Sequence, residues 1–291
     1  MTPRPAQMMR ADMAAGERDR AQERRPAGEL HELPPVKQEA KEAVINIVPA
    51  PCAGWAFFLD IDGTLLDIAQ HPNEVAVDTG LRSLLLRLEV ASAGAMALIS
   101  GRSITDIDRL FAPLRFASAG QHGAERRDAR GRTHRRTSPD ARLSGARARL
   151  RELAAGNPGL VLEDKGFSLA LHYRMAPQLG GEARRTLREL VAGLGGEFDL
   201  QEGKMVLEIK PSGRDKGSAI AEFMQEEPFR GKNPVFLGDD LTDEFGFALV
   251  NRLGGHSIKI GTGASCAPWR LADATAVREW LRDYNARFAP A

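Results

Sequence analysis

The chain has 291 residues, of which 43% are hydrophobic, 27% charged and 6% aromatic. This length suffices for one large domain or two modest ones, and the composition is typical of a globular protein with a substantial core. The 40 Lys and Arg residues balance the 39 Asp and Glu residues, which argues against binding to nucleic acid or to a membrane surface. Two cysteines, Cys52 and Cys266, are too few for a disulfide framework.

Residues 1–50 differ in composition from the rest of the chain. Up to residue 43 they are rich in Arg, Glu, Ala, Gln and Pro and contain almost no Val, Ile or Phe. We expect a disordered extension, because such a segment buries too little apolar area to offset its loss of entropy. An arm that binds a partner is the alternative. Since the chain also has no secretory signal pattern and no apolar run of ~20 residues, we expect a cytoplasmic protein.

From Trp55 onward, short apolar runs alternate with helical patterns. The apolar runs cover residues 56–59, 95–99, 115–119, 234–237 and 256–260. Leucines at 81, 84, 85 and 88 follow the helical spacing, and so do the apolar residues after Asp215. Strands that alternate with helices predict an α/β fold with a Rossmann-like parallel sheet, here made of residues 51–136 and 212–291.

Residues 137–211 carry a different pattern, in which a helix and two strands occur twice. The expected elements are helices at 141–154 and 183–194 and strands at 160–164, 167–174, 197–201 and 205–210. This order predicts an antiparallel sheet backed by two helices. We therefore expect an α+β cap domain inserted into the parallel-sheet domain.

Polar residues follow three of the apolar runs. In chain order they are Asp60, Asp62, Gly63 and Thr64; Ser100 and Arg102; and Asp239, Asp240 and Asp243. Because ligands bind at the carboxyl ends of parallel strands, these side chains are expected at one edge of the sheet. Lys216 adds a cation, on a helix for which Asp215 is the predicted N-cap.

Carboxylates that converge in this way repel one another unless a cation joins them. Oxygen ligands without Cys or His favour Mg²⁺. A carboxylate can also attack phosphorus, so Asp60 and Asp62 can divide nucleophilic attack and proton transfer, while Ser100 and Lys216 supply a donor and positive charge. Each motif alone has a simpler interpretation as a turn, a loop or a helix cap. Their joint occurrence after buried strands favours catalysis.

Alternation along the inserted strands puts four polar side chains on one face of the predicted sheet and the apolar ones on the other. These four are Glu163, Lys165, Arg174 and Glu208. The polar face has two interpretations. It is either a solvated outer surface or a clamp for the hydroxyl groups of a sugar.

The catalytic motifs together resemble those of the haloacid dehalogenase superfamily of phosphohydrolases, and the insertion corresponds to its type 2 cap. A closer resemblance, to the trehalose-6-phosphate phosphatases, rests on further segments between about Ala56 and Leu281. These segments are Glu163–Lys165, Leu171–Arg174, Glu208–Pro211, Gly120–Glu125 and Phe236–Phe245.

The resemblance implies Mg²⁺-dependent hydrolysis of trehalose 6-phosphate. Asp60 is then the nucleophile, Asp62 the general acid and base, and Thr64 orients Asp62 and the phosphoryl group. The implied metal-site residues are Asp60, Asp62 through its carbonyl, Asp239, Asp240 and Asp243. The implied substrate-binding residues are Asp62, Gly63, Thr64, Arg102, Gln121, His122, Glu163, Lys165, Arg174 and Glu208.

Alternatives to this interpretation remain. His122 can equally be a buried structural histidine. A phosphatase for another sugar phosphate would share the core and differ in the cap, and a phosphomutase would also use an aspartyl phosphate. A catalytically idle subunit of trehalose synthesis is a third possibility, although no motif carboxylate is missing. We expect a monomer that acts on a small sugar phosphate.

Overall fold

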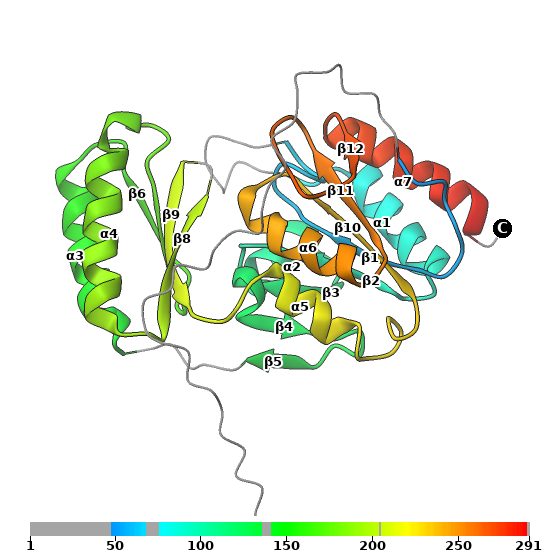
Figure 1. Cartoon of the computed structure of the whole chain (residues 1–291), viewed down its shortest axis with the longest axis horizontal. Helices are drawn as coiled ribbons and strands as arrows, with labels where there is room; N and C mark the ends of the chain where they lie inside the picture. The colour runs from blue at the N-terminus through cyan, green and yellow to red at the C-terminus, as the bar shows by residue number, and fades with distance from the viewer. Residues whose placement is uncertain (1–47, 68–75, 136–140, 204, 290–291) are drawn as a thin grey trace, which may run out of the picture.

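The computed structural model describes residues 48–67, 76–135, 141–203 and 205–289. Two sheets organise this part of the chain, one of eight strands and one of four (Figure 1). Most of the expected N-terminal extension and the first residues of the expected cap domain lie outside the described residues. No helix in the described ranges is both long enough and apolar enough to cross a membrane.

The eight-stranded sheet carries the predicted parallel strands at its centre. Its strands, in sheet order, are β12 (Trp269–Leu271), β11 (His256–Ile260), β10 (Asn233–Gly238), β1 (Trp55–Leu59), β2 (Met96–Ile99), β3 (Ala117–Gly120), β4 (Glu125–Arg127) and β5 (Thr133–Arg135). The first six are parallel, whereas β4 and β5 are antiparallel to their neighbours. The five apolar runs form five of the parallel strands, which confirms the predicted α/β fold.

Helices cover both faces of this sheet. One face packs against α1 (Thr79–Ala91), α2 (Ile104–Phe111) and α7 (Ala274–Phe288), and the other against α5 (Lys216–Phe223) and α6 (Glu244–Arg252). In β1, Phe57 belongs to the first of these cores and Phe58 to the second. A strand buried on both faces reads as a continuous apolar run, which is why the sequence predicted it. Val48 packs against the first core, so this domain begins slightly before residue 51.

Strand β4 was not predicted because all three of its residues are charged. They are nevertheless buried, since each finds a partner. Glu125 accepts a hydrogen bond from the Ile104 amide (2.7 Å), Arg126 pairs with two glutamates of the α5 region, and Arg127 binds Asp108 in a bidentate manner. Buried charges persist in proteins when they are paired in this way.

The four-stranded sheet, with its two helices, is called the cap below (residues 141–203 and 205–211). Its antiparallel strands are, in sheet order, β6 (Val161–Asp164), β7 (Leu169–His172), β9 (Val206–Pro211) and β8 (Phe198–Gly203), and its helices are α3 (Leu143–Gly156) and α4 (Gly180–Leu194), with the 3₁₀ turn η3 (Pro177–Leu179) before α4. The helices pack on the outer face through a separate apolar core. The opposite face is turned toward the parallel-sheet domain (Figure 1).

Candidate active site

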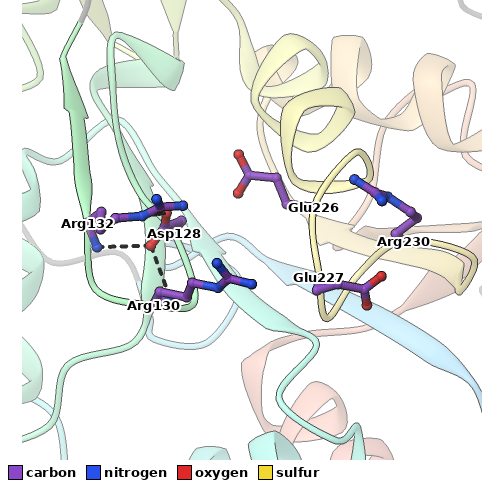
Figure 2. A pocket seen from close by; sticks show the side chains of 6 residues that line it. All are labelled: Asp128, Arg130, Arg132, Glu226, Glu227 and Arg230. Carbon is purple, nitrogen blue, oxygen red and sulfur yellow. Dashed lines mark hydrogen bonds and ion pairs between the residues drawn. The ribbon is translucent and has the colours of Figure 1, made fainter.

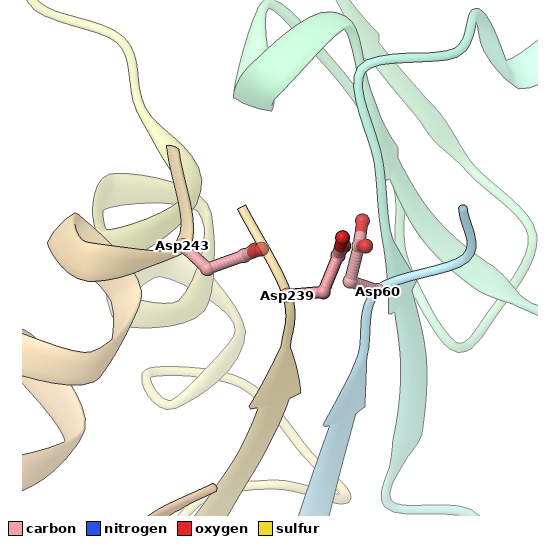
Figure 3. A group of neighbouring side chains, drawn as sticks. All are labelled: Asp60, Asp239 and Asp243. Atoms are coloured by element: carbon pink, nitrogen blue, oxygen red, sulfur yellow. The ribbon is translucent and has the colours of Figure 1, made fainter. Parts of the chain in front are cut away.

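Three carboxylates meet at the carboxyl edge of the parallel sheet. Asp60 directly follows β1, Asp239 follows the neighbouring strand β10, and Asp243 closes the 3₁₀ turn η4 (Leu241–Asp243) (Figure 3). One ligand oxygen of each lies within 4.8 Å of the others. Lys216, at the start of α5, donates to Asp60 Oδ1 at 2.7 Å and to Asp243 Oδ1 at 2.6 Å. The distant motifs are therefore assembled as predicted from the order of the strands.

Local capping brings Lys216 and Asp243 to this edge. Asp215 is the N-cap of α5, as predicted, and its side chain accepts a hydrogen bond from the Ser218 amide at 2.7 Å. Asp240 caps η4 by accepting from the Leu241 amide at 2.8 Å. Asp240 therefore takes the helix-cap alternative and is not grouped with the three carboxylates. Its amide in turn donates to Asp243 Oδ2 at 2.9 Å.

The buried carboxylate cluster contains more negative than positive groups. Burial raises the pKa of Asp60 well above the ordinary range; the charge of Lys216 partly offsets this rise, whereas the charges of Asp243 and Asp239 add to it. Burial, followed by the charge of Asp243, raises the pKa of Asp239 to about 7. Burial would lower the pKa of Lys216, but the charges of Asp243 and Asp60 outweigh it and raise this pKa. One lysine does not neutralise three carboxylates.

The residues present fit a divalent cation with oxygen ligands. Asp239 Oδ1 is buried and has no hydrogen-bond partner in the described structure, which is costly unless another group binds it. Both oxygen atoms of Asp243 are already engaged by Lys216 and by the Asp240 amide. The oxygen atoms of Asp60 are likewise engaged by Lys216 and Thr64, so Asp239, with its unpartnered Oδ1, is the carboxylate best placed to hold the ion, and Asp60 and Asp243 lie beside it.

Gly63 allows the first motif to approach Asp239. Its φ of +85° is in the left-handed region, and a Cβ added at this position would lie only 2.2 Å from Asp239 Oδ2. Thr64, which follows, is fully buried and donates to Asp60 Oδ2 at 3.2 Å. Thr64 was expected to orient Asp62, but the structure places its hydroxyl against Asp60 instead.

Asp62 is bound by the loop after β2. Arg102 donates from Nε and Nη2 to the two oxygen atoms of Asp62, each at 2.6 Å. Ser100, buried at the end of β2, accepts from the Arg102 amide at 3.1 Å through its hydroxyl oxygen. The side chain of Asp62 is not grouped with the acidic cluster, and ligation through its carbonyl stays a prediction.

The polar face of the cap is covered by the parallel-sheet domain. The side chains of Lys165 and Glu208 are only 7% and 6% exposed, and Lys165 Nζ lies 3.3 Å from Glu208 Oε1 and 3.9 Å from Glu163 Oε2. Across the sheet, Glu163 and Glu208 are the neighbours of Ala170 on its two sides. The interpretation as a solvated outer face is therefore wrong for this part of the face.

Charge pairing keeps these cap residues ionised despite their burial. Burial opposes the charge of Glu208, but the charge of Lys165 and the hydrogen bonds with His122 and Ser168 help to hold the pKa of this carboxyl far below its usual range, whereas burial lowers the pKa of His122 itself. Similarly, the pKa of Lys165 is raised by Glu208 and Glu163 against the effect of burial, and His172 helps to lower the pKa of Glu163. The result is an array of fixed donors and acceptors.

Gln121 and His122 form the 3₁₀ turn η2 (Gln121–Gly123) after β3, and both are buried. His122 Nε2 lies 3.2 Å from Glu208 Oε2, and Gln121 Oε1 lies 3.3 Å from the Ser168 hydroxyl oxygen. They were expected to line the substrate cleft, and the structure shows them in contact with the cap.

Sequence reasoning assigned no role to two further cap residues. His172 Nε2 lies 2.9 Å from Glu163 Oε2, and Ser168 donates to Glu208 Oε1 at 2.6 Å. The alternation of β7 does place both on the polar face, which is the signal that could have found them. Arg174 lies two residues beyond the end of β7 and is half-buried; its role in sugar binding stays a prediction.

A hollow of about 280 Å³ lies away from this cluster, beside the β4–β5 turn and the segment after α5 (Figure 2). It is lined by Asp128, Arg130, Arg132, Glu226, Glu227 and Arg230. Asp128 is fully occupied there by the Arg130 and Arg132 amides, the Arg132 side chain and His134. Because charges of both signs line the hollow, it does not select an anionic substrate.

Comparisons with known proteins agree with this arrangement. A family model described as trehalose-phosphatase matches residues 58–274. The trehalose-6-phosphate phosphatase of Escherichia coli (strain K12) is 53% identical over 233 residues, which cover 80% of this chain and 87% of the relative. The crystal structure of a trehalose-6-phosphate phosphatase related protein has a TM-score of 0.67 and 29% identity, and the match covers 79% of this chain and 97% of that one.

A more distant structure supports the fold alone. A haloacid dehalogenase-like hydrolase from B. subtilis matches with a TM-score of 0.55 at 13% identity, and the match covers 78% of this chain and 99% of that one. The predicted haloacid dehalogenase-like fold is thereby confirmed.

Proposed function

The chain belongs to the trehalose-phosphatase family, and we propose that it hydrolyses trehalose 6-phosphate to trehalose and inorganic phosphate through an aspartyl-phosphate intermediate. The observation that carries the proposal is the meeting of Asp60 and Lys216 at the sheet edge beneath a cap whose charged side chains are buried. The first group of residues suits phosphoryl transfer and the second suits a sugar.

Asp60 is the nucleophile in this proposal. Its Oδ1 is bound by Lys216 and its Oδ2 by Thr64, which fixes the carboxylate for attack on phosphorus. Attack forms the bond between an Asp60 oxygen and phosphorus and breaks the bond between phosphorus and O6 of the sugar. Lys216 and the hydroxyl of Ser100 supply positive charge and a donor for the phosphoryl oxygens.

Asp62 transfers the protons. It gives a proton to the departing O6 and, as a carboxylate, then takes one from the water that hydrolyses the phosphoaspartate. Arg102 binds both oxygen atoms of Asp62 in the structure. A phosphoryl group binds guanidinium in the same bidentate manner. We therefore expect Arg102 to bind the phosphoryl group of the substrate instead of Asp62, which leaves the Asp62 carboxyl able to transfer protons.

Asp60 and Asp239, with the carbonyl of Asp62, would hold Mg²⁺. The buried, unpartnered Asp239 Oδ1 and the raised pKa values of Asp60 and Asp239 support a cation at this point. When bound, the ion supplies positive charge that stabilises the phosphoryl group in the transition state.

The cap recognises the disaccharide in this proposal. Lys165 carries three donor protons, and Glu163 and Glu208 offer acceptors on either side of it. Such an array matches the alternating donors and acceptors of sugar hydroxyls. A small phosphate ester makes none of these contacts and is therefore expected to be a poor substrate.

The direct test is phosphate release from a panel of sugar phosphates, with and without a chelator. We expect trehalose 6-phosphate to be preferred over sucrose, glucosylglycerol and hexose phosphates, and we expect the chelator to abolish release and added Mg²⁺ to restore it. Preference for another sugar phosphate would refute the substrate. Isomerisation of the sugar phosphate without phosphate release would indicate a phosphomutase.

A further inference from the structure

The turn η2 holds two consecutive non-glycine residues in the left-handed region. Gln121 has a φ of +48° and His122 a φ of +54°, and both side chains are buried. Long and ring-bearing side chains rarely adopt this conformation, since it costs conformational energy that surrounding contacts must offset. Two such residues in succession are therefore held in place by the contacts that surround them.

The backbone of η2 is tied to the loop that carries Ser100 and Arg102. The amide of Gln121 donates to the Arg102 carbonyl at 2.9 Å, and the amide of His122 donates to the Ser100 carbonyl at 3.1 Å. In addition, Gln121 Nε2 lies 3.3 Å from Glu125 Oε1, which accepts from the Ile104 amide. The turn and the catalytic loop thus form one hydrogen-bonded unit of the parallel-sheet domain.

The side chains of η2 reach the cap. His122 binds Glu208 Oε2, and the Ser168 hydroxyl donates to Glu208 Oε1 at 2.6 Å while Gln121 Oε1 lies 3.3 Å from the same hydroxyl oxygen. The side chains of His122 and Glu208 are 9% and 6% exposed, and Ser168 is fully buried. Ser168 is therefore covered from solvent, and its hydroxyl is bound to the Glu208 carboxylate at 2.6 Å.

We propose that Gln121 and His122 form a latch that holds the cap over the active site by binding Ser168 and Glu208, and that Ser168 is a positioning residue that orients Glu208 toward the sugar. The proposal rests on the proposed function, since it concerns the closed complex with a sugar phosphate. It replaces direct sugar binding by Gln121 and His122 with a contact between the two domains.

Because the latch joins two domains, its members are energetically coupled to each other. Ser168→Ala removes both contacts of the hydroxyl, with Gln121 and with Glu208, so a substitution of Gln121 should cost less in that background than it does alone. A hydrogen bond that involves an ionised group such as Glu208 changes kcat/KM by roughly tenfold or more when it is lost. A small phosphate ester gains nothing from the cap contacts and is spared most of this loss.

The test is a double-mutant cycle with Ser168→Ala and Gln121→Asn, because asparagine accepts the left-handed backbone but is one methylene too short. On trehalose 6-phosphate we expect Ser168→Ala to lose roughly tenfold in kcat/KM, Gln121→Asn to lose less, and Gln121→Asn to cost less in the Ser168→Ala background than it does alone. On p-nitrophenyl phosphate each variant should lose less than about twofold. Losses that multiply, or equal losses on both esters, would overturn the latch.

A second pair of variants tests His122 with a matched control. The amide of glutamine can occupy the place of Nε2, whereas asparagine is too short, so His122→Gln should retain activity that His122→Asn loses. Equal activity of the two would contradict the latch. Thermal unfolding of each variant identifies any that fails to fold. If the wild-type protein prefers another sugar phosphate, the proposed function fails, and the same cycles on that substrate still decide the latch.

Discussion

Gly54 and Gly63 offer a matched pair of substitutions with which to test the geometry of the carboxylate cluster. Both are in the left-handed region, with φ values of +83° and +85°. A Cβ added at Gly54 would meet no atom within 4 Å, whereas one added at Gly63 would lie 2.2 Å from Asp239 Oδ2 and 2.5 Å from Oδ1. Gly54→Ala thus reports backbone strain alone, and Gly63→Ala adds a collision with Asp239.

The magnitudes follow from these distances. Left-handed backbone costs a residue with a Cβ about 1–2 kcal/mol, which in a domain of this size lowers the melting temperature by roughly 2–8 °C. We expect this loss for both variants. At position 63 the carboxylate of Asp239 must also move by about 1 Å to reach ordinary contact distance, and a displacement of that size at a catalytic site costs about 100-fold in rate.

The assay compares melting temperature with the rate of phosphate release at saturating Mg²⁺. We expect Gly54→Ala to release phosphate at the wild-type rate and Gly63→Ala to be about 100-fold slower, although both melt earlier than wild type. Wild-type turnover by a folded Gly63→Ala variant would show that Asp239 does not need its observed position. The assignment of Asp239 to the metal site would then be refuted.

Three further substitutions probe the charges. Asp60→Asn should lower the rate of phosphate release at least about 1,000-fold. The melting temperature should not fall, since the substitution removes a buried negative charge. Residual turnover above a few per cent of the wild-type rate would show that Asp60 is not the nucleophile. Lys216→Met leaves Asp60 and Asp243 without their cation, so we expect about 3–5 kcal/mol less stability in urea denaturation, and a loss below 1 kcal/mol would contradict this pairing. The pKa of Glu208 is lowered in the folded state, so its contribution to stability is present above about pH 4.5 and is lost as the pH falls further. Glu208→Gln should therefore flatten the decline of the unfolding free energy between about pH 5 and 3. An unchanged slope would refute the pairing of Glu208 with Lys165.

Strong periodic signals made much of the fold predictable. Phe57 and Phe58 are adjacent and both fully buried, each in a different apolar core, because helices cover both faces of a parallel sheet. This arrangement produces apolar runs that end abruptly in polar residues. The position of Asp60 and Asp239 at one sheet edge follows directly, since topology alone places the ends of parallel strands together.

Features that depend on partners distant in sequence were not predictable in the same way. In β4, Arg126 pairs with Glu222 and Glu226, and Arg127 pairs with Asp108. These partners allow the two arginines to be buried, and no local sequence pattern indicates such pairing. Likewise, Gln121 carries no sequence signal for left-handed backbone, which is usually supplied by glycine, asparagine, aspartate or histidine. The conformation of Gln121 and His122 is imposed by the catalytic loop on one side and by the cap on the other.

The charges at the sheet edge connect the cation, the substrate and the cap. Asp60, Asp239 and Asp243 carry more negative charge than Lys216 can balance, and a phosphate monoester brings nearly two further negative charges at neutral pH. In the proposed function, we therefore expect substrate binding at this edge to require a divalent cation and the movement of Arg102 from Asp62 to the phosphoryl group. Arg102 lies in the loop whose carbonyls hold η2, and η2 holds the cap through Glu208. A cap substitution that loosens Glu208 is thus expected to disturb phosphate binding as well, because this loop links the sugar site to the phosphate site through a chain of hydrogen bonds.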